Sequence, residues 1–348
     1  LKKIFLCILS VNLIKMCAHI NLPVIIIRSA IIIFSLLLFL PLVVAQPGKL
    51  LIVTTFPNLV EDVKLVASEE ETVSLVPAGA DPHDYQLTSR DLDLIREANL
   101  IVSTAHTSFE VDLRRKIEQR EFSATLVELT KIPGIAILNN PVLNQPNYHM
   151  PIYDPRNYKL FVKYLALKLA ELNPLKAKIY LNRANNVAKE VDSLIESTPK
   201  LNVIAAADYP FTQYAVSWLG VEIRYLIVKE AGVSATPSDI EKLKEALARK
   251  EVKLVVVAEP VELPASKLLK SLAEKYDVPV LYVPLPFSSG SILSKLKYIA
   301  SQAKIIKLQV SEEETLLRKE NPLIRIIAGV LSLLIIAELY VYYWRVRE

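Results

Sequence analysis

Three histidines in predicted loops are the residues of this chain best suited to metal chemistry. The sequence has only four histidines. His83 lies in the stretch PAGADPHDYQL, His106 in STAHTSFE and His149 in NYHMPIYDPRN. Neutral imidazole groups, together with carboxylates, are suitable ligands for first-row divalent metals. The loops could therefore supply part of a metal site.

Carboxylates in the second half of the chain lie at comparable positions. Asp208 and Tyr209 follow an apolar run in AAADYPFTQY, and Glu259 ends another in VVVAEP. Each has a structural alternative, because Asp208 could cap the next helix and Glu259 could cap the turn before Pro260. A loop histidine is likewise often solvated or hydrogen-bonded. Residue type alone therefore leaves both kinds of role open.

The apolar runs alternate with helical patterns in two blocks of the chain. Residues 49–129 place strand-like runs such as KLLIVTT and NLIVSTA between helix-like stretches such as TSRDLDLIREA. Residues 201–308 repeat the alternation, and a proline-containing loop and two helical patterns separate the blocks. This alternation predicts parallel sheets. We expect two α/β lobes, each with a mostly parallel sheet, joined by a long helix.

This architecture would gather the candidate residues. Ligands of open α/β sheets bind at the carboxyl ends of the strands, and ligands of two-lobed proteins bind in the cleft. The candidates that follow strand-like runs are His83, His106, Asp208, Tyr209 and Glu259. His149 precedes the first connecting helix. All of them are expected to face the cleft or its margin.

The same patterns predict an order of segments along the chain. The expected segments are a leader at 1–45, an N-terminal α/β lobe at 46–153, connecting helices at 154–198, a C-terminal α/β lobe at 199–308, a charged stalk at 309–322, and a transmembrane anchor with a short cytoplasmic tail at 323–348. Arg28, the apolar run after it, and Val43 and Ala45 before Gln46 are typical of a cleaved secretory leader. An over-extended gene start and an uncleaved anchor are the alternatives.

The C-terminus predicts membrane attachment. Residues 326–344 are almost wholly apolar, and at about 1.5 Å per residue they would extend roughly 28 Å, close to the hydrocarbon thickness. Arg345 and Arg347 follow, which places the tail inside and the bulk of the protein on the extracytoplasmic face. Cys7 and Cys17 both lie in the leader, so the mature chain has no cysteine for a disulfide or a lipid. A C-terminal transmembrane helix is therefore the expected anchor.

The charge distribution excludes one class of partner. The formal net charge is +4, and the basic residues form no run. Nucleic-acid-binding proteins carry clustered basic residues, so we expect no nucleic-acid partner.

Most of the chain resembles a known family. The run from KLLIVTTFPNLVEDVKLVA through VPAGADPHDYQL to NLIVSTAHTSFE is similar to the zinc/manganese-type (cluster 9) metal substrate-binding proteins of ABC importers. The resemblance covers roughly residues 49–305. It implies two α/β lobes bridged by a rigid helix, a divalent metal ion held between them, and permease and ATPase subunits as partners of a monomeric protein. It also implies that His83 and His149 are metal ligands.

The second half departs from the family pattern. The family's third ligand follows the first strand of the second lobe, where Tyr209 keeps the register and Asp208 stands beside it. We expect Asp208 to be the ligand, because a phenol with a pKa near 10 must lose a proton to bind well. The position of the fourth ligand is occupied by Pro284, while Glu259 and His106 would lie near the site. The metal, whether zinc, manganese or iron, stays open.

Three functions remain on these grounds. The first is a binding protein that delivers a divalent metal to an importer. The second is a metal-dependent hydrolase using His83, His149 and Asp208, with Glu259 as base. The third is a surface protein that kept the fold and lost the site. No nucleophile motif and no HExxH sequence supports the hydrolase, so we expect a binding protein and not an enzyme.

Overall fold

The computed structural model describes residues 48–77 and 84–347, with side chains throughout these ranges except at 310–329 and 340–347. His83 and the predicted leader lie outside the described residues.

Lobe one is a parallel sheet covered by helices. Its strands, in the sheet order β2-β1-β3-β4, are β2 (Glu71–Ser74), β1 (Leu51–Thr54), β3 (Leu100–Ser103) and β4 (Thr125–Glu128). Its helices are α3 (Pro57–Ala67), α4 (Ser89–Glu97) and α5 (Ser108–Glu118). The apolar run of β3 is buried at every residue, as expected for a strand covered on both faces. The predicted capping box of α4 is present, with Thr88 and Asp91 bonding each other's backbone.

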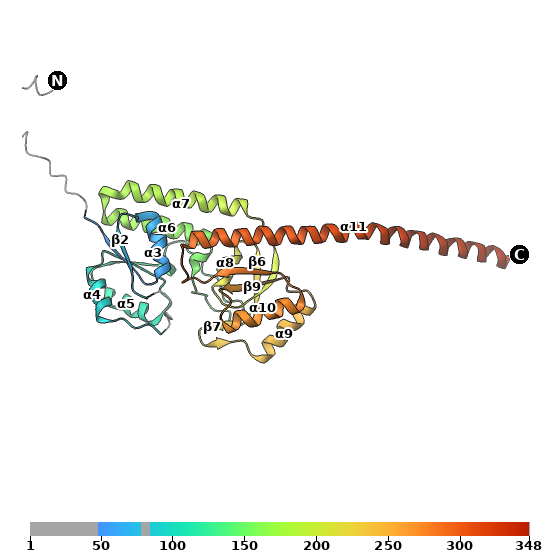
Figure 1. The fold of residues 1–348 in the computed structure, drawn as a ribbon, viewed down its shortest axis with the longest axis horizontal. Helices are drawn as coiled ribbons and strands as arrows, with labels where there is room; N and C mark the ends of the chain where they lie inside the picture. Colours follow the sequence, from blue (N-terminus) through green and yellow to red (C-terminus); the bar gives the residue numbers. More distant parts are fainter. Residues whose placement is uncertain (1–47, 78–83, 348) are drawn as a thin grey trace, which may run out of the picture. The chain divides into compact units, whose positions relative to one another are not determined.

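Two long helices connect the lobes. The connection contains η1 (Leu129–Lys131), η2 (Pro151–Tyr153), α6 (Pro155–Leu172), η3 (Pro174–Lys176) and α7 (Ala177–Ser197). Asp154 caps α6, because its carboxylate accepts a hydrogen bond from the Arg156 backbone at 2.8 Å. Figure 1 shows α6 and α7 lying side by side, and they contact α3 of lobe one and α11 (Ile292–Arg347).

Lobe two repeats the parallel architecture. Its strands, in the order β10-β9-β5-β6, are β10 (Val280–Pro284), β9 (Leu254–Glu259), β5 (Val203–Ala207) and β6 (Val221–Leu226). Its helices are α8 (Thr212–Ser217), α9 (Pro237–Ala248) and α10 (Pro264–Tyr276). An antiparallel hairpin, β7 (Val228–Glu230) and β8 (Val233–Ser234), stands between β6 and α9. The two predicted α/β lobes are confirmed, but the hairpin was not foreseen.

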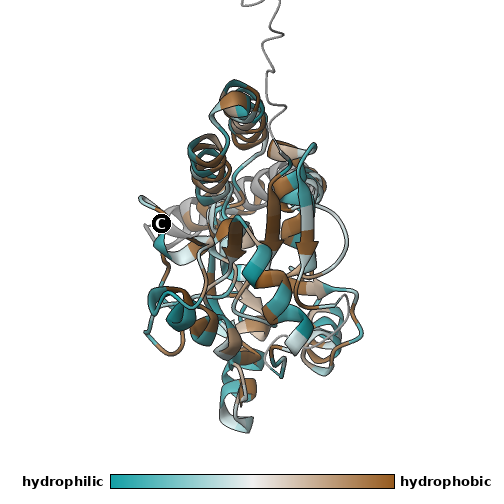
Figure 2. Ribbon diagram, turned by 90° about the vertical axis from the view of Figure 1, so that its left-hand side faces the viewer, coloured by the Kyte–Doolittle hydropathy of each residue, from teal (hydrophilic) through white to brown (hydrophobic). Residues whose placement is uncertain are grey.

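One apolar cluster runs through both lobes. It contains Ile52 of β1, Phe161 of α6 and Val256 of β9, all fully buried. Figure 2 shows brown strands in both sheets, whereas the helices carry teal and brown faces. Burial of apolar surface is the main favourable term in folding, so the continuous cluster joins the lobes through α6.

The predicted transmembrane helix at 323–348 is wrong. The C-terminal residues belong to α11 (Ile292–Arg347), which begins in the core of lobe two and continues well past it (Figure 1). Within the described residues, no helix is both long enough and apolar enough to cross a membrane.

Candidate metal centre

Three segments distant in sequence bring His106, His149 and Glu230 together. One ligand atom from each lies within 4.8 Å of the others, and all three residues are half-buried. The two imidazole rings meet edge to face, with centroids 4.3 Å apart. His106 follows β3 of lobe one, His149 precedes η2, and Glu230 ends β7 of lobe two. We call this group the metal centre, since its three side chains could hold a metal ion. It joins residues of both lobes.

Asn147 orients the His149 ring. The Asn147 amide nitrogen donates to Pro210 O and to Gln213 Oε1, each at 2.9 Å, so its Oδ1 is the atom turned toward His149. That oxygen accepts from the His149 backbone at 3.0 Å and lies 3.0 Å from Nδ1. An amide oxygen only accepts, so Nδ1 carries the proton and Nε2 faces the centre. This is the orientation in which a histidine offers Nε2 to a metal.

Glu230 meets that same nitrogen. Its Oε1 lies 2.9 Å from His149 Nε2 and also accepts from the Ala231 backbone at 3.0 Å. The side chain of Glu230 is 25% exposed and that of His149 is 15% exposed, so water reaches the pair. A carboxylate and an imidazole held at this distance can exchange a shared proton for a cation.

The loop carrying His106 is built around a buried carboxylate. Glu110 is 1% exposed and accepts from the backbones of Thr104, His106 and Thr107, at 2.7, 2.9 and 3.0 Å. Burial opposes ionisation, but these hydrogen bonds and those from nearby hydroxyl groups outweigh it and hold the pKa of Glu110 below its usual value. Three converging backbone donors fix the position of His106.

Left-handed backbone adjoins both histidines. Ala105 has φ +62° and Met150 has φ +52°, values that cost residues with a side chain roughly 1–2 kcal/mol. Ala105 precedes His106 and Met150 follows His149. Such conformations persist where the surroundings fix them, and they concentrate at functional sites.

The structure places the predicted Asp208 apart from this group. Asp208 is fully buried in lobe two, where its Oδ2 accepts from Ala258 N and Ser266 Oγ, both at 2.6 Å. Burial raises its pKa to about 6, although those hydrogen bonds act in the opposite direction. Its partners belong to β9 and α10, so the carboxylate ties these elements to the end of β5.

Tyr209 and Glu259, the two residues of lobe two that were predicted to lie near the site, also have their contacts outside the metal centre. The Tyr209 ring stacks on Phe211, with centroids 6.2 Å apart, and packs against the lobe's apolar residues. Glu259 is half-buried and takes a hydrogen bond from the side chain of Tyr298 on α11. Among the described residues named from sequence, only His106 and His149 meet in the metal centre.

Sequence reasoning missed Glu230 because its hairpin carries a weak pattern. The stretch VKEAGVS has no sustained alternation, and its turn is marked only by Gly232, which adopts φ +72°. Asn140 anchors the hairpin from the connecting loop, since its amide donates to Lys229 O at 2.7 Å. That long-range bond, invisible in the sequence, places Glu230 opposite the histidines.

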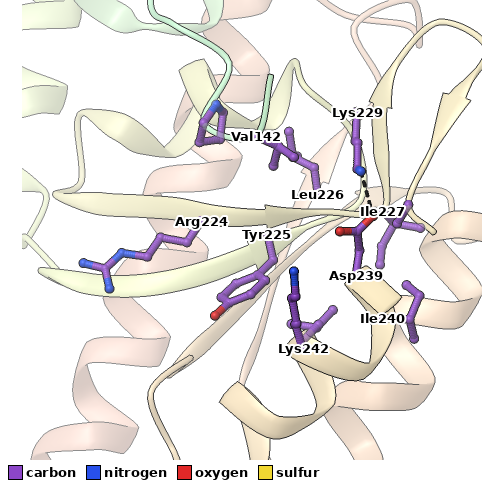
Figure 3. Close-up of a pocket in the computed structure, with 12 residues that line it drawn as sticks. Val142, Arg224, Tyr225, Leu226, Ile227, Lys229, Asp239, Ile240 and Lys242 are labelled. Carbon is purple, nitrogen blue, oxygen red and sulfur yellow. Dashed lines mark hydrogen bonds and ion pairs between the residues drawn. The ribbon is translucent and has the colours of Figure 1, made fainter. Parts of the chain in front are cut away.

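A separate cavity lies behind the hairpin, shown in Figure 3. It holds about 220 Å³. Its lining includes Tyr225, Lys229, Asp239 and Lys242, and the dashed line marks the 2.7 Å ion pair between Lys229 and Asp239. Successive strand side chains point to opposite faces, so Lys229 faces the cavity while Glu230 faces the histidines. No residue of the metal centre lines this cavity.

The donor set limits the chemistry. Two imidazoles and one carboxylate suit Zn²⁺, Mn²⁺ and Fe²⁺, and they lack the thiolates that select soft metals. The group contains no hydroxyl or thiol nucleophile. The arrangement can therefore hold a divalent ion between the lobes.

Comparison with known proteins gives one family match and several relatives. Residues 52–298 match the model of the family described as zinc-uptake complex component A periplasmic. The chain is 25% identical to the metal ABC transporter substrate-binding lipoprotein FimA of Streptococcus parasanguinis, over 67% of this chain and 79% of that protein. It is 26% identical to a putative metal-binding protein of Thermotoga maritima, over 69% and 85% of the two chains.

Solved structures share the fold. The SBP FpvC from Pseudomonas aeruginosa in complex with Mn²⁺ superposes with a TM-score of 0.59 at 18% identity, covering 74% of this chain and 99% of that one. A crystal structure of ZnuA superposes equally well, at 17% identity and over 74% and 98% of the chains.

Proposed function

The chain belongs to the zinc-uptake complex component A family, and on this premise we propose that it captures a divalent metal ion with His106, His149 and Glu230. It is a substrate-binding protein of an ABC metal importer and not an enzyme, as expected from sequence. One observation supports the site above all: atoms of both lobes converge within 4.8 Å on a donor set suited to such an ion.

Capture would exchange a proton for the metal. In the structure His149 Nε2 and Glu230 Oε1 hold each other at 2.9 Å. A divalent ion entering between them needs the lone pair of Nε2, so binding releases the proton that joins the two groups. Asn147 keeps Nδ1 protonated throughout, which leaves Nε2 as the donor. Opposite sides of the ion would then be held by different lobes.

Two ligands expected from sequence, His83 and Asp208, are not part of this three-residue set. His83 lies outside the described residues and stays a prediction, and Asp208 was expected to be the lobe-two ligand. The geometry favours Glu230 over Asp208, because Glu230 already contacts His149 while Asp208 is engaged with Ala258 and Ser266. We therefore assign the lobe-two ligand to Glu230.

The protein acts on the extracytoplasmic side and would hand its ion to the importer. The relatives include metal ABC transporter substrate-binding lipoproteins, which supports permease and ATPase subunits as partners. The cargo is a divalent metal ion; manganese and zinc are both compatible with the donors, and related proteins are described with each.

Calorimetric titration of the full chain with Zn²⁺ and Mn²⁺ tests the assignment. Glu230→Gln keeps the shape and removes the charge, so we expect affinity for the metal to fall about tenfold or more. Glu241→Gln makes the same change on an exposed face of α9 and serves as the matched control. Asp208→Asn should also leave affinity nearly unchanged. Loss of affinity in Asp208→Asn, with none in Glu230→Gln, would overturn the assignment.

A further inference from the structure

A second contact between the lobes lies away from the metal centre and contains two buried ionisable side chains. Asp62 of α3 is fully buried, and Lys295 of α11 is 3% exposed. Asp62 Oδ1 accepts from Tyr158 Oη at 2.7 Å and from Ile292 N at 2.9 Å. One carboxylate oxygen thus ties a helix of lobe one to the connecting helix α6 and to the first residue of α11.

The loop between β10 and α11 is fixed by the same group of residues. Lys295 Nζ donates to Pro286 O at 2.7 Å and to Ser288 O at 2.8 Å. Tyr153 of η2 donates to Pro284 O at 2.8 Å. The Phe287 ring then contacts Phe56 of lobe one, with centroids 4.8 Å apart. The loop therefore reaches across from lobe two and is held by polar groups at both ends.

The contact is incompletely satisfied as it stands. Within the described residues, Asp62 Oδ2 and both polar atoms of the Asn58 amide have no hydrogen-bond partner. A buried polar group without a partner costs free energy that solvation would recover. Separation of α3 from the start of α11 would expose these atoms to water and recover part of that free energy.

We propose that Asp62, Tyr158 and Lys295 form a proton-operated clasp between the lobes: protonation of Asp62 holds the lobes together, and loss of that proton loosens them. In the closed state the Asp62 carboxyl is out of water, which disfavours its charged form. In an opened state it would be hydrated and would ionise as an ordinary aspartate. Closing the clasp therefore takes up a proton.

The other groups around Asp62 do not reverse this behaviour. Burial raises the pKa of Asp62 to about 7, against hydrogen bonds from Tyr158 and Ile292 and the nearby charge of Lys295. Burial lowers the pKa of Lys295 to about 8, so it stays protonated in both states below that pH. Burial raises the pKa of Tyr153 and of Tyr158 well above 10, which leaves both neutral. The remaining charge facing Asp62 is Glu61, which also favours protonation.

Hydrogen exchange on the full metal-free chain tests the clasp. The opening constant is the exchange rate divided by the intrinsic rate at the same pH, measured by mass spectrometry for peptides from 57–67 and 292–299. Between pH 5.5 and 8.0 we expect this constant to rise roughly tenfold or more in both peptides, since one pKa unit is a tenfold change. A peptide from α9, whose Asp239 carboxyl has a lowered pKa and stays ionised over this range, should show no such rise. An unchanged constant at the two clasp segments would overturn the proposal.

Two variants locate the proton. Asp62→Asn keeps an acceptor for Tyr158 and Ile292 but cannot titrate, so its opening constant should not change with pH. Tyr158→Phe removes a hydrogen bond that lowers the pKa of Asp62, so the midpoint of the rise should move to higher pH. A pH response retained in Asp62→Asn would overturn the proposal. If that variant does not fold, an unmoved midpoint in Tyr158→Phe would overturn it.

Discussion

Two of the contacts between the lobes, the metal centre and the clasp, differ in how far water reaches them. At the metal centre, the His149 imidazole and the Glu230 carboxylate form a pair whose side chains are 15% and 25% exposed. At the clasp, Asp62 and Lys295 are almost wholly buried. Solvated charges exchange partners at little cost, while buried charges are costly to create or leave unpaired. The metal centre is therefore suited to capture and release of an ion, and the clasp to holding the lobes together.

The largest expected difference concerns the dependence of stability on pH. Because the pKa of Asp62 is raised from 3.8 to about 7, the folded chain keeps a proton that the unfolded chain has released between about pH 4 and 7. The contribution of this group is therefore present below pH 4 and lost as pH rises through 7. Three units correspond to about 4 kcal/mol as an upper estimate. In denaturant unfolding, the free energy of unfolding should fall between pH 5 and 8 in the wild type, and it should fall much less in Asp62→Asn.

An exposed aspartate supplies the control for that experiment. Asp93 forms a surface pair with Arg96, and its side chain is 72% exposed. Asp93→Asn should leave the decline in stability as it is in the wild type, since surface pairs contribute at most about 1 kcal/mol. If the unfolding free energies of Asp62→Asn and Asp93→Asn change with pH in the same way, Asp62 is no more important to the pH dependence than a surface aspartate.

The next effect belongs to the metal centre. His149→Ala removes one donor of a three-residue set and should weaken Zn²⁺ binding by at least about 100-fold, or about 2.7 kcal/mol. The change should leave the stability-versus-pH curve at the clasp intact. Calorimetry would measure affinity, and Tyr148→Ala, an exposed neighbour, serves as the control. Equal affinity in His149→Ala and wild type would contradict the site.

A smaller effect is expected one residue further out. Asn147 holds the His149 ring by Nδ1, and loss of such an orienting partner lowers metal affinity by roughly tenfold. Asn147→Ala should thus weaken Zn²⁺ binding less than His149→Ala does. Asn173→Ala, at the buried end of α6, controls for removal of an interior amide. An Asn147→Ala protein that binds as tightly as wild type would show that the ring needs no support.

The two α/β lobes could be predicted from sequence because the patterns that indicate their strands and helices are local. The run LIVS of β3 and the pairing of Thr88 with Asp91 act within a few residues, and both appear in the structure as expected. The prediction of a C-terminal transmembrane helix was wrong. It rested on apolar composition, which did not show that α11 begins inside lobe two. Local pattern thus predicts elements better than it predicts their surroundings.

The site was readable only in part. His149 was named from sequence as a metal ligand and His106 as a residue near the site, since histidines are rare in this chain. Glu230 was missed because its place depends on the hairpin and on Asn140, which lies 89 residues away. Asp208 was favoured on acidity alone, and its burial against Ser266 depends on α10. Long-range contacts decided both cases.

Anomalous diffraction at the zinc absorption edge, from crystals of the full chain grown with Zn²⁺, would show directly whether His106, His149 and Glu230 hold the ion. We expect an anomalous peak about 2.0–2.2 Å from a ring nitrogen of His106, from Nε2 of His149 and from a carboxylate oxygen of Glu230. A peak held by Asp208, with Glu230 turned away, would contradict this expectation.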